Sequence, residues 1–142
     1  MMQKINSILV PVDGSAASIR GLNLAIMFAK SLDAKIIALN IIRYSNGFQF
    51  PVSSEIKQIH KKNAERIILE AQNMARKQNV LFIGKILKGD NIGREIIKFS
   101  KIKKYDLIVI GSRGPYAGSE TFLGSVANYI LHKTKIPVTI TK

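Results

Sequence analysis

The sequence contains no cysteine and only two histidines among its 142 residues. Without cysteine there can be no disulfide, no thiolate nucleophile and no cysteine-based metal site, and this composition fits the reducing cytoplasm. The two histidines, His60 and His132, stand far apart in the sequence. Because acidic residues are also few, no short stretch supplies both a general base and a nucleophile. The sequence therefore points to no catalytic residues and to no metal site of its own.

Long apolar runs are also missing. No run approaches the roughly 18 residues that a membrane-spanning helix needs. The first seven residues lead directly into the apolar segment at Ile8 and lack the apolar core of a signal peptide. We therefore expect a soluble, cytoplasmic protein without a membrane span.

Two common nucleotide-binding motifs are absent. The chain has no Gly-x-x-x-x-Gly-Lys-Ser/Thr run and no Gly-x-Gly-x-x-Gly run. A P-loop ATPase and a dinucleotide-binding fingerprint are both excluded at the level of the sequence.

Negative charge is scarce. Nine Asp and Glu residues stand against 22 Lys and Arg, which gives a formal net charge of +13 and an isoelectric point near 10.2. Such a charge favours acidic partners in general and invites nonspecific contact with nucleic acid or anionic lipid. The basic residues are densest at Lys61 and Lys62, at Arg76 and Lys77, and between residues 98 and 104. Only the last group resembles a patch, and a solvated face is the alternative explanation for each group.

The chain alternates buried strands with amphipathic helices. Its length and its 46% hydrophobic content suit a single domain over residues 1–142. The apolar patterns predict strands at 4–12, 35–42, 80–87, 107–110 and 137–141. They predict helices from Ser15 or Ser18 to Leu32, at 56–76, at 91–101 with Asp90 as its cap, and at 125–132. Residues 44–54 form a loop long enough for a flap. The order of elements indicates an α/β fold, a doubly wound open parallel sheet of five strands with helices on both faces.

The glycine-rich stretch from Gly111 to Val126 has the composition of a phosphate-binding loop. It follows the predicted strand at 107–110 and precedes the helix that Ser125 opens. Gly111 and Gly114 can adopt positive φ and, because they lack Cβ, let backbone N–H groups approach an anion closely. The first N–H groups of a helix have no internal partner, so the start of this helix suits a phosphate. A tight turn without a ligand is the alternative.

Four positions carry a family resemblance: Gly111, Gly114 after two further residues, and Gly124-Ser125 after nine more. This spacing resembles the nucleotide-binding signature of the universal stress protein family. The segments Val10-Pro-Val-Asp13 and Ile136-Pro-Val also lie where that family has them, so the resemblance covers the whole chain. It implies the strand order 3-2-1-4-5, ATP as ligand, and homodimers that form through the last strand. It also implies that Asp13 and Gly111 are neighbours at the site.

The resemblance assigns roles within the site. Asp13 would accept hydrogen bonds from the ribose hydroxyls or the adenine amino group, although capping the following helix would also explain an aspartate there. Ser125 would donate to a phosphate, with an ordinary N-cap as its alternative. The predicted binding residues are Pro11, Val12 and Ile41 at the adenine, Asp13 at the nucleoside, and Gly111, Ser112, Arg113, Gly114, Gly124, Ser125 and Val126 around the phosphates.

The nine-residue spacer departs from the family. It contains Glu120 and no basic residue, where many relatives have Lys or Arg. The carboxylate of Glu120 would suit Mg²⁺ or Mn²⁺ bound together with ATP. The sequence thus predicts an ATP-binding regulatory or sensing module. Two alternatives stay open: slow ATP hydrolysis or phosphoryl transfer, and a basic interaction module that does not use nucleotide.

Overall fold

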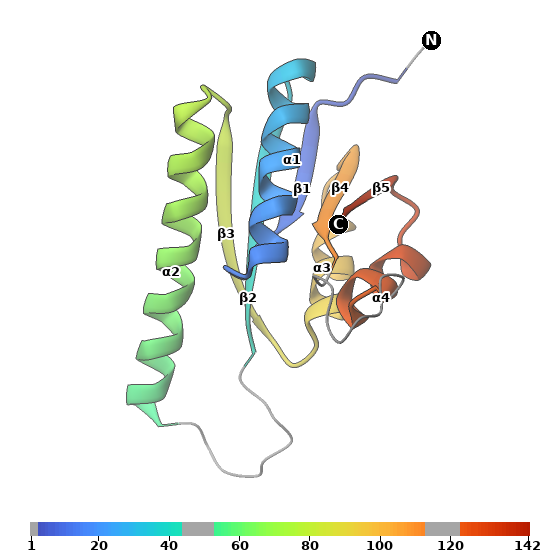
Figure 1. Cartoon of the computed structure of the whole chain (residues 1–142). Helices are drawn as coiled ribbons and strands as arrows, with labels where there is room; N and C mark the ends of the chain where they lie inside the picture. The colour runs from blue at the N-terminus through green and yellow to red at the C-terminus, as the bar shows by residue number, and fades with distance from the viewer. Residues whose placement is uncertain (1–2, 44–52, 113–122) are drawn as a thin grey trace.

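The computed structural model describes residues 3–43, 53–112 and 123–142. Strands and helices alternate along the chain (Figure 1). The elements are β1 (Ser7–Pro11), α1 (Ala16–Leu32), β2 (Lys35–Arg43), α2 (Ser54–Lys77), β3 (Phe82–Gly89), α3 (Ile92–Ser100), β4 (Leu107–Gly111), α4 (Ser125–Lys133) and β5 (Val138–Thr141). No helix in these ranges is long and apolar enough to span a membrane.

The five strands form one parallel sheet in the order β3-β2-β1-β4-β5, which confirms the predicted fold class and strand order. Leu9 at the centre of β1 pairs with Ile37 of β2 on one side and with Ile108 of β4 on the other. The chain therefore winds outward from β1 in both directions. The carboxyl ends of β1 and β4 meet where the order reverses, which is where open α/β sheets bind ligands.

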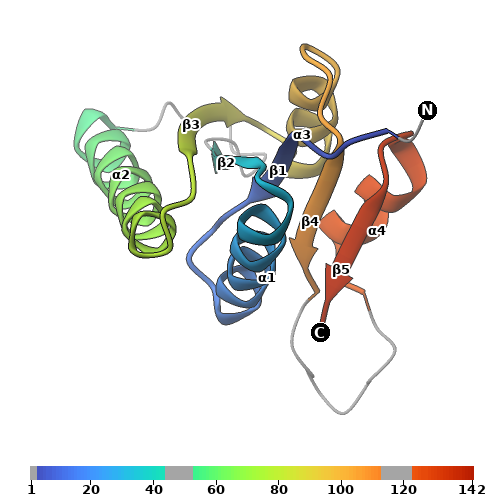
Figure 2. The same ribbon diagram turned by 90° about the horizontal axis from the view of Figure 1, so that it is seen from above.

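Helices cover both faces of the sheet (Figures 1 and 2). On one face α1 and α2 pack over a core that includes Ile8, Val10 and Val109. On the other face α3 and α4 pack over a second core that includes Leu9 and Ile108. Because β1 and β4 are covered on both sides, their residues are almost continuously apolar, as the sequence pattern predicted.

The helix ends settle two predictions. α1 is capped by Ser15, whose Oγ accepts a hydrogen bond of 3.2 Å from the N–H of Ser18. The helix ends at Asp33 in the left-handed region, with φ 53°. The prediction of Asp90 as the cap of α3 was wrong, because the side chain of Asn91 accepts the hydrogen bond of 2.9 Å from the N–H of Arg94.

Three apolar residues of the predicted amphipathic helices are exposed. Ile56 and Ile59 lie in the amino-terminal half of α2, whose buried residues begin only at Ala64. Figure 1 shows this end of α2 extending beyond the neighbouring strands, so no sheet lies under these side chains. Ile19 in the first turn of α1 is likewise 43% exposed. The predicted loop at residues 44–54 falls mostly outside the described residues.

Candidate functional site

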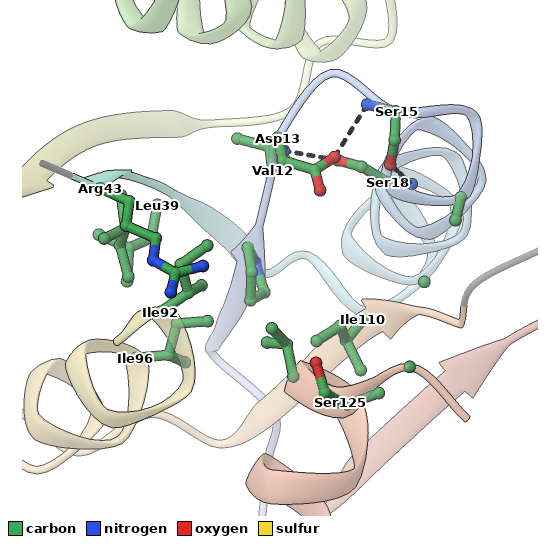
Figure 3. A pocket seen from close by; sticks show the side chains of 17 residues that line it. Val12, Asp13, Ser15, Ser18, Leu39, Arg43, Ile92, Ile96, Ile110 and Ser125 are labelled. Carbon is green, nitrogen blue, oxygen red and sulfur yellow. Dashed lines mark hydrogen bonds between the residues drawn. The ribbon is translucent and has the colours of Figure 1, made fainter. Parts of the chain in front are cut away.

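A cavity of about 320 Å³ lies at the carboxyl ends of β1, β2 and β4 (Figure 3). Its walls come from these strand ends and from the amino-terminal parts of α1, α3 and α4. Eight of the predicted binding residues line it: Pro11, Val12, Asp13, Ile41, Gly111, Gly124, Ser125 and Val126. Segments more than 100 residues apart in the sequence thus meet around one space.

The other three predicted residues are not part of this lining. Ser112 is buried, and its N–H donates a hydrogen bond of 2.8 Å to the carbonyl of Thr141 at the edge of the sheet. Its backbone N–H is therefore engaged in joining β4 to β5. Arg113 and Gly114 lie outside the described residues, as does Glu120.

Asp13 shapes the turn between β1 and α1. Its Oδ1 accepts a hydrogen bond of 2.8 Å from the N–H of Ser15, while its own N–H donates to the Oγ of Ser18 at 3.0 Å. Ser15, rather than Asp13, is the N-cap of α1. The side chain is exposed and its second carboxylate oxygen bonds to no described residue. Asp13 thus stabilises the turn and still presents an acceptor at the rim of the cavity.

Gly14 follows Asp13 and has a backbone conformation that favours glycine. Its φ of +83° lies in a region that other residues rarely adopt, and it is the one glycine with positive φ among residues 3–43, 53–112 and 123–142. Gly111 does not use the positive φ that glycine allows. Gly111 ends β4 in extended conformation, and a Cβ there would overlap the backbone carbonyl of Ala17. A glycine is needed at this position because α1 packs directly on the end of the strand.

The start of α4 differs from the other helix starts. Side chains of Ser15, Ser53 and Asn91 cap α1, α2 and α3, but the N-cap of α4 is Gly124, which has no side chain to accept a hydrogen bond. Ser125 is the first helical residue rather than the cap. Among the residues that the structure describes, the first N–H groups of α4 consequently have neither an intrahelical acceptor nor a side-chain cap. Gly124, Ser125 and Val126 all line the cavity, so this positive end of the helix borders it.

The inner wall of the cavity is apolar. In addition to the predicted Val12 and Ile41, it contains Leu39, Ile92, Ile96, Ile110 and Ala127. Asn40 is buried beside this wall and donates a hydrogen bond of 2.8 Å from Nδ2 to the carbonyl of Val12, which fixes the end of β1. Such a wall suits the flat apolar face of a nucleobase or another ring.

Arg43 is a site residue that the sequence analysis missed. It is the last residue of β2, and Figure 3 shows its guanidinium pointing toward Ile92 and Ile96 inside the cavity. Arg43 is two residues after Ile41, so strand alternation places both on the same face of the sheet. That alternation is the signal that would have identified Arg43. Among the described residues lining the cavity, Arg43 carries the positive charge and Asp13 the negative charge.

The described part of the chain contains no group of three or more His, Asp or Glu residues able to hold a metal ion. Among residues 3–43, 53–112 and 123–142, Asp13 alone offers a carboxylate at the cavity. One carboxylate fits a Mg²⁺ or Mn²⁺ ion that takes its remaining ligands from phosphates and water. The described residues by themselves do not form a metal site.

The chain was compared with known proteins. Residues 4–142 match the model of the universal stress protein family. Universal stress protein MJ0531 from Methanocaldococcus jannaschii is 30% identical over 138 residues, which cover 95% of this chain and 81% of that protein.

Two solved structures share the fold. A universal stress protein in complex with cAMP superposes with a TM-score of 0.77 at 21% identity and covers 99% of both chains. A family protein from Arabidopsis thaliana with AMP bound gives a TM-score of 0.72 at 20% identity and covers 95% of this chain and 90% of that one. The family model spans nearly the whole sequence. The strand order of the sheet is also the one that the resemblance to this family implied. The chain belongs to the universal stress protein family.

Proposed function

We propose that the protein binds ATP, together with Mg²⁺ or Mn²⁺, and acts as a regulatory or sensing module. One observation carries this proposal: eight of the eleven residues selected from the sequence for nucleotide binding line a single cavity, to which β1, β2, β4 and α4 contribute. Its volume lies within the range of small-molecule sites. The AMP and cAMP named with the two solved structures support an adenine nucleotide as the ligand.

The cavity offers different chemistry at its two sides. The apolar wall around Val12 and Ile41 would receive the adenine, and the free carboxylate oxygen of Asp13 would accept hydrogen bonds from the nucleoside. The uncapped start of α4 would bind phosphate through its free N–H groups, because these groups and the helix dipole both favour an anion. This arrangement orients the nucleotide with its phosphates toward Gly124 and Ser125.

A change of the helix cap tests this orientation. Gly124 has φ −60° and ψ 157°, values that an aspartate N-cap also adopts. Gly124→Asp would place a carboxylate on the free N–H groups, which stabilises α4 and repels phosphate. We expect calorimetry to show that ATP affinity falls at least about tenfold, a loss of about 1.4 kcal/mol, while the thermal midpoint of unfolding does not decrease.

Gly124→Asn is the matched control, since it caps the helix without adding charge. We expect it to lose less ATP affinity than Gly124→Asp. Unchanged ATP binding in Gly124→Asp would contradict the placement of the phosphates at α4. Absence of any ATP binding by the wild-type protein would contradict the function itself.

The proposal extends to assembly and location. β5 is an edge strand that pairs only with β4 among the described strands, so its outer backbone groups are available to a second copy. We therefore include a homodimer formed through β5. A cytoplasmic location is also part of the proposal and is supported by the lack of cysteine. Nucleic-acid binding, if it occurs, is expected to be nonspecific and driven by the net charge of +13.

A further inference from the structure

A second cavity, of about 680 Å³, lies at the opposite end of the sheet. It is bordered by the segment before β1, by the beginnings of β2 and β3, and by the connection from α3 to β4. Lys35 and Ile37 at the start of β2 belong to this cavity, whereas Ile41 and Arg43 at the end of β2 belong to the first. The two sites are therefore separate, and nothing in the proposed ATP site accounts for the second one.

Positive charge dominates this second cavity, which we call the lysine cavity. Five exposed lysines line it: Lys4, Lys35, Lys85, Lys103 and Lys104. None of them forms an ion pair with any residue that the structure describes.

The one carboxylate in the lining is already engaged. The Oδ2 of Asp106 accepts hydrogen bonds from the N–H of Asn6 at 2.8 Å and from the N–H of Ser7 at 3.1 Å. These bonds hold the start of β1 against β4. Five lysines thus stand against one carboxylate in this lining, and the excess of positive charge attracts an anion with several negative charges.

Exposed aliphatic side chains accompany the lysines. Ile102 is 72% exposed and stands between Lys101 and Lys103, and Ile83 on the other side of the cavity is 43% exposed. The pairing of cations with exposed aliphatic groups is typical of proteins that bind the interface of an anionic membrane.

The aromatic residues of the cavity do not offer a surface for nucleobases. Phe99 and Tyr105 stack on one another with ring centroids 5.7 Å apart, and Tyr105 is only 7% exposed. Single-stranded nucleic acid is bound largely by stacking on accessible rings, so this lining favours a lipid partner. Burial raises the pKa of the Tyr105 hydroxyl above its ordinary value. A second copy of the chain is disfavoured here because it would bring like charges together.

We propose that the lysine cavity and Ile102 form a docking surface for membranes that contain anionic phospholipids. The lysines contact headgroup phosphates, and Ile102 and Ile83 enter the interface between headgroups and acyl chains. Such docking brings the amino ends of the strands to the membrane. The ATP cavity at the opposite end of the sheet is left facing away from it.

Flotation with vesicles tests the proposal on the full chain. We expect wild-type protein to float with vesicles of equal parts phosphatidylcholine and phosphatidylglycerol at low salt, and not with phosphatidylcholine alone. Each lysine near an anionic surface contributes about fivefold to binding. Lys103→Gln combined with Lys104→Gln should therefore weaken binding about 25-fold.

The matched control is Lys61→Gln with Lys62→Gln, which lowers the net charge equally on exposed positions of α2, on the other face of the molecule. We expect it to change binding less than about threefold, because distant charges are screened. Ile102→Ser should also release the protein at a salt concentration that the wild type tolerates, whereas Ile59→Ser, at a position 64% exposed on α2, should not.

Three results would overturn the proposal. Equal losses in the two double variants would mean that net charge alone drives binding. Complete displacement by free glycerophosphoglycerol at concentrations matching the lipid headgroups would assign the cavity to a small phosphate compound. Failure to bind vesicles, combined with oligonucleotide binding that depends on Lys103 and Lys104, would assign it to nucleic acid.

Discussion

The Cα of Gly111 lies against the backbone carbonyl of Ala17, so closely that a Cβ on Gly111 would overlap this carbonyl. Gly21, one turn further along α1, approaches the same place, since a Cβ there would come within 2.9 Å of the N of Gly111. The two glycines let α1 rest directly on the end of β4. This contact brings the loop after β1 and the end of β4 together at the edge of the cavity.

Gly111→Ala should destabilise the fold. The added methyl group meets backbone rather than a side chain that can move, so we expect a loss of unfolding free energy on the order of 1–3 kcal/mol. Urea denaturation measures this loss of unfolding free energy. Gly124→Ala is the control, at a position with ordinary backbone angles, and should cost about 1 kcal/mol or less. A stable Gly111→Ala variant that binds no ATP would show that the glycine serves the ligand rather than the packing.

Asp13→Ala should weaken ATP binding more than the binding of inorganic triphosphate, because the carboxylate is assigned to the nucleoside. A lost charge-assisted hydrogen bond costs about 1.5–3 kcal/mol, so calorimetry should show a loss of about tenfold or more for ATP. Asp13→Asn keeps an oxygen for the N–H of Ser15 and so preserves the turn. Equal losses for both ligands in Asp13→Ala, absent in Asp13→Asn, would identify collapse of the turn as the cause.

The sequence predicted the architecture well because its signals are local and strong. Continuous apolar strands and amphipathic helices were enough for the α/β class, and the family resemblance carried by the spacing from Gly111 to Ser125 implied the strand order. Eight of the eleven predicted binding residues line one cavity, and nucleotide binding by them stays a prediction. The features that the sequence did not reveal depend on distances between elements. The close approach of Ala17 to Gly111 cannot be read from either residue alone. Likewise, the exposure of Ile59 follows from where the sheet ends and not from the pattern of α2, which is amphipathic throughout.

Arg43→Ala should lower the affinity for ATP, because Arg43 is the cation of the described cavity lining. We expect a loss of about tenfold at low salt that shrinks as salt is raised, since the side chain is exposed and its charge is screened. Arg43→Lys should recover part of the affinity if charge matters, and none if the planar guanidinium is required. Equal ATP affinity in all three proteins would remove Arg43 from the site.

Ile140→Pro should convert the proposed homodimer into a monomer. Pro137 and Thr141 direct their carbonyls at β4, so alternation turns the N–H of Ile140 to the free edge of β5. Proline removes that N–H and cannot pair with a second strand. Ile140→Thr is the control, because it also shortens a side chain that packs on the core but keeps the N–H. Light scattering should find a monomer only for the proline variant, and a wild-type monomer at high micromolar concentration would contradict the dimer.

Binding rather than turnover is the expected activity. Asp13 is the one carboxylate that the described residues bring to the cavity, and its Oδ1 is already engaged by the N–H of Ser15. Efficient phosphoryl transfer also needs a group that positions the attacking water or hydroxyl, and typical kinases then reach about 1–100 per second. We expect phosphate release well below about 1 per second.

Gly114→Val is the variant to compare, since the sequence pattern places Gly114 in the phosphate-binding loop, where a β-branched side chain would fill the space for phosphate. It should abolish ATP binding in calorimetry while the protein stays folded. Turnover of several per second in the wild type, lost in Gly114→Val, would instead establish the protein as an ATP hydrolase.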